Sequence, residues 1–239
     1  MKRIETLPIV AASIMAAASF SATPVLAADT ANDRADAISR DQAQNEERPD
    51  AKELLNEATG VVDQMKGDPE LAKLLDRAKG VYIVPDFGRG ALVVGGRGGG
   101  GLVLAKQNGE WTNPAFFDFG AISFGPQAGV SAGSVAFLLM SDEAVNAFKN
   151  GNVFSLNAEA GLSIVDYSAN AQDSIGKGDI VFWSDTEGAY AGATVSLTDV
   201  NWDEDDNGAF YDKSVDAARI LNGEVSKSVG APLKKALSG

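Results

Sequence analysis

The sequence contains neither cysteine nor histidine among its 239 residues. Their absence excludes disulfides, thiolate nucleophiles and the usual cysteine or histidine ligands of zinc. It also excludes a serine–histidine–aspartate or a cysteine–histidine catalytic centre. Any general base would have to be a carboxylate, a lysine or a tyrosine. We therefore expect a protein without catalytic activity, whose core is held by packing alone.

Basic residues are scarce: 20 lysines and arginines face 33 aspartates and glutamates, for a formal net charge of −13. Proteins that bind DNA or RNA normally present a basic surface to the phosphates, so we expect no nucleic-acid partner. The charge is also segregated. The formal charges of residues 79–106 sum to +3, whereas those of residues 166–213 sum to −9.

The first 27 residues have the pattern of a secretory signal. Lys2 and Arg3 precede an apolar run from Leu7 to Phe20, and small residues follow up to Ala27. An uncleaved membrane anchor is the alternative, but the run is short for a spanning helix, which needs about 20 residues. We predict cleavage after Ala27 and a periplasmic or secreted protein.

Residues 28–49 are acidic and have almost no large apolar side chains. Such a segment cannot bury enough surface to offset the entropy of ordering it. We interpret it as a disordered linker or a frayed helix, and we assign residues 50–239 to a single domain.

The domain is predicted to begin with two helices. Asp50 and Glu53 have capping-box spacing, and apolar residues then recur at helical intervals up to Gly67. Asp68 followed by Pro69 is typical of a second helix start, and Gly80 ends that helix.

Short strands rich in glycine follow the two helices. We predict strands at 81–84, 90–97, 101–106, 135–140, 180–183 and 189–197, a further alternating strand over 154–164, and a hairpin turn at Asn108-Gly109. Short helices are expected at 141–148 and 214–221, with a terminal turn at 232–237. This order predicts an α+β fold: N-terminal helices, then a curved, mostly antiparallel, Gly-rich sheet with short helices.

One acidic stretch resembles the start of a calcium-binding loop. Asp203, Asp205 and Asn207 occupy the first three ligand positions, and Gly208 occupies the sharp turn. The twelfth position is Ser214 instead of the bidentate glutamate, so Asp212 would have to substitute as a ligand. The alternative is a solvated acidic turn between a strand and the last helix. Calcium is therefore the one cofactor that the sequence suggests.

Aromatic residues cluster at Trp111, Phe116, Phe117, Phe119 and Phe124. They could line an apolar ligand pocket. Packing in the core is the interpretation that we favour, because large aromatic side chains are mostly buried in any domain.

A series of short motifs resembles the SYLF domain, a lipid-binding family also described as a yeast actin-binding domain. The resemblance covers roughly Lys52 to Leu237, and it depends on the order and spacing of the motifs together. They are Ala78–Pro85, the Gly-rich run Gly95–Gly101, Gly109–Ala115, Phe124–Gly129, Glu143–Phe148, Gly188–Gly192, Asn207–Tyr211 and Ile220–Gly223.

The resemblance implies a non-enzymatic module that contacts membrane lipid, phosphoinositides in eukaryotic members. In an exported setting this predicts binding to phospholipid or another component of the cell envelope, and it makes actin an unlikely partner. The alternative function is a calcium-responsive structural or protein-interaction module.

The lipid contact is predicted within the basic stretch 79–106. Arg89 and Arg97 lie between glycines, which expose backbone N–H groups and let a phosphate approach closely. Lys79 and Lys106 complete the predicted set. Pairing of the two arginines with the abundant carboxylates of residues 166–213 is the alternative.

Overall fold

A computed structural model describes residues 50–87, 99–124, 133–151, 153–157, 161–167, 178–185, 195–225 and 227–238. They belong to a compact unit that spans Glu47–Gly239. The predicted signal (1–27), the linker (28–49) and the strand predicted at 90–97 lie outside the described residues, as does most of the strand predicted at 189–197.

Two helices open the described part of the chain. They are α2 (Ala51–Lys66) and α3 (Pro69–Arg77). The Asp50 carboxylate accepts hydrogen bonds from the Lys52 and Glu53 amides, and the Asp68 carboxylate caps α3 in the same way. Both helix starts were predicted from these capping residues, and both are confirmed.

The sheet is curved and mostly antiparallel, as predicted. Its strands are β1 (Gly80–Phe87), β2 (Gly100–Gln107), β3 (Glu110–Trp111), β4 (Ala115–Asp118), β5 (Ala121–Phe124), β6 (Gly133–Leu139), β7 (Phe154–Leu156), β8 (Ile164–Asp166), β9 (Ile180–Ser184) and β10 (Val195–Trp202). Neighbours pair in the order β5-β10-β4-β2-β1-β6-β9-β8, with β3 on β2 and β7 on β10. Only the β8–β9 pair is parallel among the described strands.

The sheet bends where β4 passes into β5 along β10. The two short strands pair with successive parts of β10. Between these parts Asp199 has a positive φ of 53°, and Gly120 lies against it. A Cβ on Gly120 would come within 2.6 Å of the Asp199 Cβ, so this corner requires glycine.

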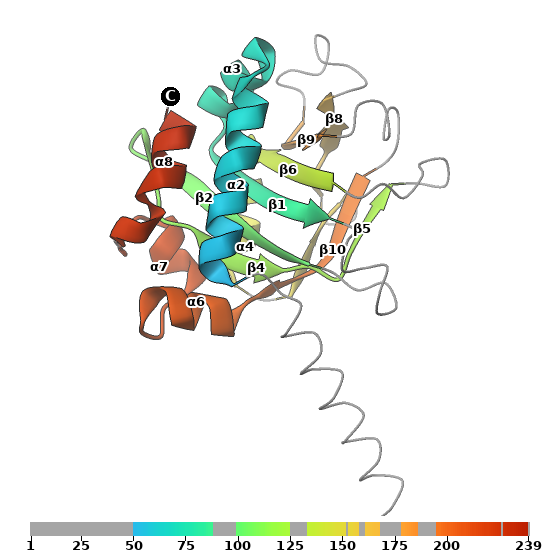
Figure 1. Ribbon diagram of the computed structural model, residues 1–239. Coiled ribbons are helices and arrows are strands. Elements are labelled where there is room, and N and C mark those ends of the chain that lie inside the picture. Colours follow the sequence, from blue (N-terminus) through green and yellow to red (C-terminus); the bar gives the residue numbers. More distant parts are fainter. Residues whose placement is uncertain are drawn as a thin grey trace, which may run out of the picture. The chain divides into compact units, whose positions relative to one another are not determined.

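Helices cover both faces of the sheet. Adjacent residues of β2 show this, because successive side chains on a strand point to opposite faces. Gly100 faces Leu54 of α2, and Gly101 faces Tyr82, whose ring packs on Phe148. Phe148 belongs to α4 (Asp142–Lys149). Figure 1 shows α2 crossing the strands in front.

The remaining helices belong to the C-terminal part of the chain. They are α6 (Glu204–Tyr211), α7 (Ala217–Leu221), the 3-10 turn η1 (Ser228–Gly230) and α8 (Ala231–Ser238). α8 lies alongside α2 (Figure 1). Among the described helices, none is both long and apolar enough to span a bilayer.

Three local predictions are wrong. The alternating run 154–164 forms two strands, β7 and β8, with Gly161 at a positive φ of 78° between them. The acidic stretch 203–208 belongs to helix α6 and is not a turn. The helix predicted from Ser214 begins at Ala217, because Asp216 is its capping residue.

The aromatic cluster packs in the core, as we favoured. Trp111, Phe116, Phe117 and Phe119 are all buried. The Phe117 ring meets Phe148 at 5.3 Å and Trp202 at 5.4 Å, both edge-on. These contacts pack aromatic side chains between the sheet and α4.

Candidate functional site

Lys79 and Lys106 lie side by side at one end of the β1–β2 ladder. The Lys106 amide donates a hydrogen bond to the Lys79 carbonyl oxygen at 2.7 Å. We call this pair the basic corner. The antiparallel pairing of β1 and β2 places the start of one strand against the end of the other, so residues far apart in sequence meet there.

Both lysines of the basic corner have partners. The Lys79 Nζ lies 2.6 Å from an Asp142 carboxylate oxygen, and both side chains are largely exposed. The Lys106 Nζ donates to the Asp76 carbonyl at 2.8 Å, near the C-terminal end of α3, and lies 4.7 Å above the Trp111 ring. An exposed ion pair is worth less than about 1 kcal/mol, so Lys79 can exchange Asp142 for a phosphate at little cost.

The other two predicted lipid residues are not placed with this pair. Arg89 and Arg97 lie outside the described residues. The strands that flank them end at Phe87 and begin at Gly100, at the opposite end of the ladder from Lys79. The described structure thus brings together two of the four residues.

The residues predicted to bind calcium have other roles in the described structure. The Asp203 carboxylate caps α6 by accepting from the Asp206 amide, and Asn207 is buried. Asp212 pairs with Lys227, and this hydrogen bond lowers the pKa of the Asp212 carboxyl. Asp205 is exposed on α6.

No group of three or more acidic side chains is arranged to hold a metal ion within the part of the chain that the structure describes. Calcium binding at this stretch stays a prediction, and a calorimetric titration with calcium is the direct measurement.

Two of the recognised sequence motifs bind each other. Asn207 makes two hydrogen bonds to the backbone of Phe116. Its side-chain oxygen accepts from the Phe116 amide at 3.1 Å, and its Nδ2 donates to the Phe116 carbonyl at 2.8 Å. One turn later, the Tyr211 hydroxyl donates to the Pro114 carbonyl at 2.6 Å. The motif 207–211 therefore satisfies the irregular backbone of the motif 109–115 and the start of β4.

Asn113 links this segment to the C-terminal part of the chain. Its Nδ2 donates to the Val225 carbonyl at 2.8 Å, and the side chain is buried. Tyr211 is buried too, and its burial raises the pKa of the Tyr211 phenol above its ordinary range. These buried donors hold the fold together.

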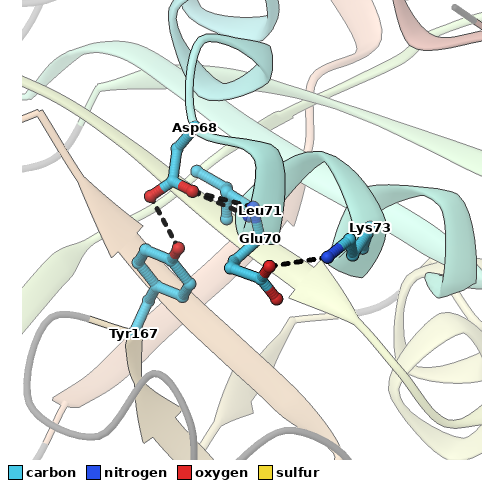
Figure 2. Close-up of polar contacts among 5 residues, drawn as sticks. All are labelled: Asp68, Glu70, Leu71, Lys73 and Tyr167. Carbon is cyan, nitrogen blue, oxygen red and sulfur yellow. Dashed lines mark hydrogen bonds and ion pairs between the residues drawn. The ribbon is translucent and has the colours of Figure 1, made fainter.

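A further polar link joins α3 to β8. The Tyr167 hydroxyl donates to the Asp68 carboxylate at 2.7 Å, while the other oxygen of that carboxylate caps the amides of Glu70 and Leu71 (Figure 2). The Tyr167 bond is the main cause of a lowered pKa of the Asp68 carboxyl. Burial and the same bond raise the pKa of the Tyr167 phenol.

Replacing Tyr167 by phenylalanine is expected to cost about 1 kcal/mol of unfolding free energy near neutral pH, because one charge-assisted hydrogen bond is lost. The folded-state pKa of Asp68 is held below 3.8, so this contribution is present above that value and is lost as the pH falls through the lowered pKa. Urea unfolding of both proteins should therefore show a difference that shrinks in acid.

The neighbouring ion pair offers a control for this experiment. Lys73 lies 2.6 Å from Glu70 on the same helix, and both side chains are exposed. Lys73→Ala should change the unfolding free energy by only a few tenths of a kcal/mol. A Tyr167→Phe protein that unfolds like the wild type at both pH values would contradict the assigned link.

The sequence prediction missed a basic segment at the C-terminus. Residues 213–239 contain five basic and two acidic residues, and two adjacent lysines, Lys234 and Lys235, lie on α8. A charge count by segment would have found them.

The geometry above defines an α+β domain with basic surface residues and a core of structural polar contacts. Comparison with known families gives a match over residues 120–239, half of the chain, to the family described as Ysc84, the Las17-binding protein actin regulator. The chain belongs to this family, and the predicted SYLF resemblance is confirmed.

Curated relatives resemble the chain over most of its length. The SH3 domain-containing YSC84-like protein 1 of Bos taurus is 24% identical over 186 residues, 76% of this chain and 54% of the relative. Protein YSC84 of Saccharomyces cerevisiae is 29% identical over 157 residues, 64% of this chain and 34% of the relative. LAS seventeen-binding protein 3 of the same yeast is 27% identical over 157 residues, with the same coverage. The chain thus spans about half or less of the length of these relatives.

Proposed function

We propose that this protein is a non-catalytic module that attaches to phospholipid membranes through their phosphate groups. The basic corner is the observation that carries the proposal. It places two lysines on neighbouring strands, joined by a backbone hydrogen bond, in a chain whose net charge is −13. Lysine ammonium groups bind phosphate as compact point charges, and the Lys79 pair with Asp142 is exposed enough to rearrange.

The chemistry of the described polar residues supports a role in binding. The side-chain donors of Asn113, Asn207 and Tyr211 all bind carbonyl oxygens of the protein's own backbone. The chain has no histidine or cysteine to act as base or nucleophile. Membership of a family described as a regulator agrees with this view.

Sedimentation with lipid vesicles tests the proposal. The protein is expected to sediment with vesicles of phosphatidylcholine that contain phosphatidylserine, and to stay in solution with phosphatidylcholine alone. High salt should release it, since the screening length falls from about 10 Å at 0.1 M to about 3 Å at 1 M. Recovery entirely in the supernatant with every lipid mixture and at every salt concentration would reject membrane binding.

A double variant tests the predicted arginines in the same assay. Arg89→Ala with Arg97→Ala should weaken binding to the anionic vesicles and leave the melting temperature unchanged, if both guanidinium groups contact phosphate. Unchanged binding by the folded variant would remove these two residues from the site.

We also propose that the protein works outside the cytoplasm, in the periplasm or as a secreted protein. The N-terminal pattern of Lys2 and Arg3, an apolar run and small residues up to Ala27 supports this. N-terminal sequencing of the protein from its host should then begin at Ala28. A retained Met1 would contradict it.

Binding to a protein is the second candidate function, and the family description is the observation that favours it. The family is described as a Las17-binding actin regulator, and a yeast relative is named for binding LAS seventeen. Co-sedimentation with actin filaments distinguishes the two functions, because a membrane-specific protein would stay in the supernatant with filaments.

A further inference from the structure

The C-terminal segment has a charge opposite to that of the protein as a whole. Residues 213–239 carry a net charge of +3, against −13 for the full chain. A charge distribution of this kind orients a protein in the field of an anionic surface, with the basic end leading.

Part of this charge is neutralised by neighbours. Arg219 pairs with Glu224 at 3.5 Å, and Lys227 pairs with Asp212. Lys234 and Lys235, by contrast, make no ion pair with any residue in the described ranges. Lys213, which precedes α7, is likewise exposed and makes no ion pair within the described ranges, but only Lys234 and Lys235 place two such charges next to each other.

The packing of α8 leaves Lys235 exposed and Lys234 partly exposed. Leu233 and Leu237, one turn apart, are buried, so they define the inner side of the helix. The helix packs against α2 and β3, and Figure 1 shows it beside α2.

The same small strand connects α8 to the basic corner. β3 contains Trp111, whose ring lies beneath the Lys106 ammonium, and β3 is also in contact with α8. Both α8 and Lys106 of the basic corner therefore contact the strand β3.

An exposed apolar side chain accompanies these lysines. Val229, in the turn η1 directly before α8, is 40% exposed. Only one other large apolar side chain, Val153, is exposed among the described residues. Ala231 and Pro232 at the start of α8 are exposed as well. Lysines on a helix that follows an exposed valine match the chemistry of the bilayer interface, where the headgroups bind the charges and the acyl boundary accepts the apolar group.

We propose that Val229, Lys234 and Lys235 form the surface that meets an anionic phospholipid bilayer. The inference rests on the membrane-binding function proposed above and adds α8 to the contact that the basic corner makes. A bilayer accounts for both the charges and the valine, whereas an acidic polypeptide accounts only for the charges.

The experiment uses a double variant of the full chain that carries both Lys234→Gln and Lys235→Gln. Its binding is compared with that of the wild type in the phosphatidylserine vesicle assay. Each lysine near an anionic surface contributes about fivefold to partitioning, so the double variant should bind roughly 25-fold more weakly than the wild type. Val229→Ser should weaken binding by a smaller factor and leave its salt dependence unchanged. The matched control is Lys73→Gln with Lys149→Gln, which removes the same charge from α3 and α4 and should bind within about twofold of the wild type.

The outcomes separate this inference from the proposed function. If the wild type binds vesicles and a folded α8 double variant binds equally well, the α8 surface is overturned and membrane binding stands. If the wild type binds no vesicles, both are overturned. If the wild-type protein does not bind vesicles but binds soluble polyglutamate through Lys234 and Lys235, the surface recognises acidic polypeptides and the membrane assignment is wrong.

Discussion

Replacing Asn207 by alanine is expected to lower the free energy of unfolding by about 2–4 kcal/mol, because the change leaves the buried amide of Phe116 without its partner and the Phe116 carbonyl with only the Asp203 amide, at 3.2 Å. The side chain of Asn207 is only 1% exposed, so water cannot take over these bonds. In a domain of this size, such a loss corresponds to a fall in melting temperature on the order of 10 °C. Thermal and urea unfolding both measure it.

Two variants make the test of Asn207 specific. Asn222→Ala removes an exposed asparagine that also precedes a glycine, and it should change stability by about 0.5 kcal/mol at most. Asn207→Asp keeps an acceptor for the Phe116 amide but places a carboxylate oxygen against the Phe116 carbonyl, so it should also destabilise. An Asn207→Ala protein within 1 kcal/mol of the wild type would show that this contact is not structural.

Replacing Gly101 by alanine should be the second large effect. A Cβ at this position would lie 2.5 Å from the Tyr82 hydroxyl oxygen and 2.6 Å from the ring carbon that bears it. Tyr82 is fully buried, and its hydroxyl donates to the Phe117 carbonyl at 3.2 Å, so the ring cannot move aside without losing that bond. Overpacking of this kind costs about 1–3 kcal/mol or more, which urea unfolding resolves.

Neighbouring glycines provide the controls. Gly100→Ala, one residue earlier, meets only Leu54 at 3.6 Å, an ordinary contact, and should be tolerated. Gly60→Ala, in α2, has no atom within 4 Å and should stabilise the helix by about 1 kcal/mol. Tyr82→Leu combined with Gly101→Ala should be less destabilised than the sum of the two single changes, because the smaller side chain relieves the clash. Additive costs would mean that the clash with Tyr82 is not the cause.

These two predictions concern motif residues, and they give the motifs a physical meaning. Asn207 and Gly101 both belong to stretches on which the family resemblance depends. In the described structure both residues are needed by the fold. Asn207 completes the hydrogen bonding of β4, and Gly101 leaves space for the buried side chain of Tyr82. These motif residues therefore identify the fold, and the two lysines of the proposed α8 contact, Lys234 and Lys235, lie outside the motifs.

The sequence alone determined the features that depend on local chemistry. Asp50 and Asp68 mark the two helix starts, because an aspartate at this position satisfies the first free amides of a helix. Asn108 and Gly109 mark the β2–β3 turn, since both residues adopt a positive φ there. The absence of cysteine and histidine limited the chemistry, and the set of motifs indicated the family.

Only the tertiary structure decided which distant residues meet. Asp203 to Gly208 has a calcium-loop pattern and weak helix propensity, yet it begins a helix because Asn207, Phe210 and Tyr211 gain buried contacts. Residues 154–164 alternate like one strand, but they divide because β7 pairs with β10 and β8 with β9. The contact of Lys79 with Lys106 likewise depends on the β1–β2 register. Pairing between remote segments is set by the packing of the whole domain, and a local pattern does not encode it.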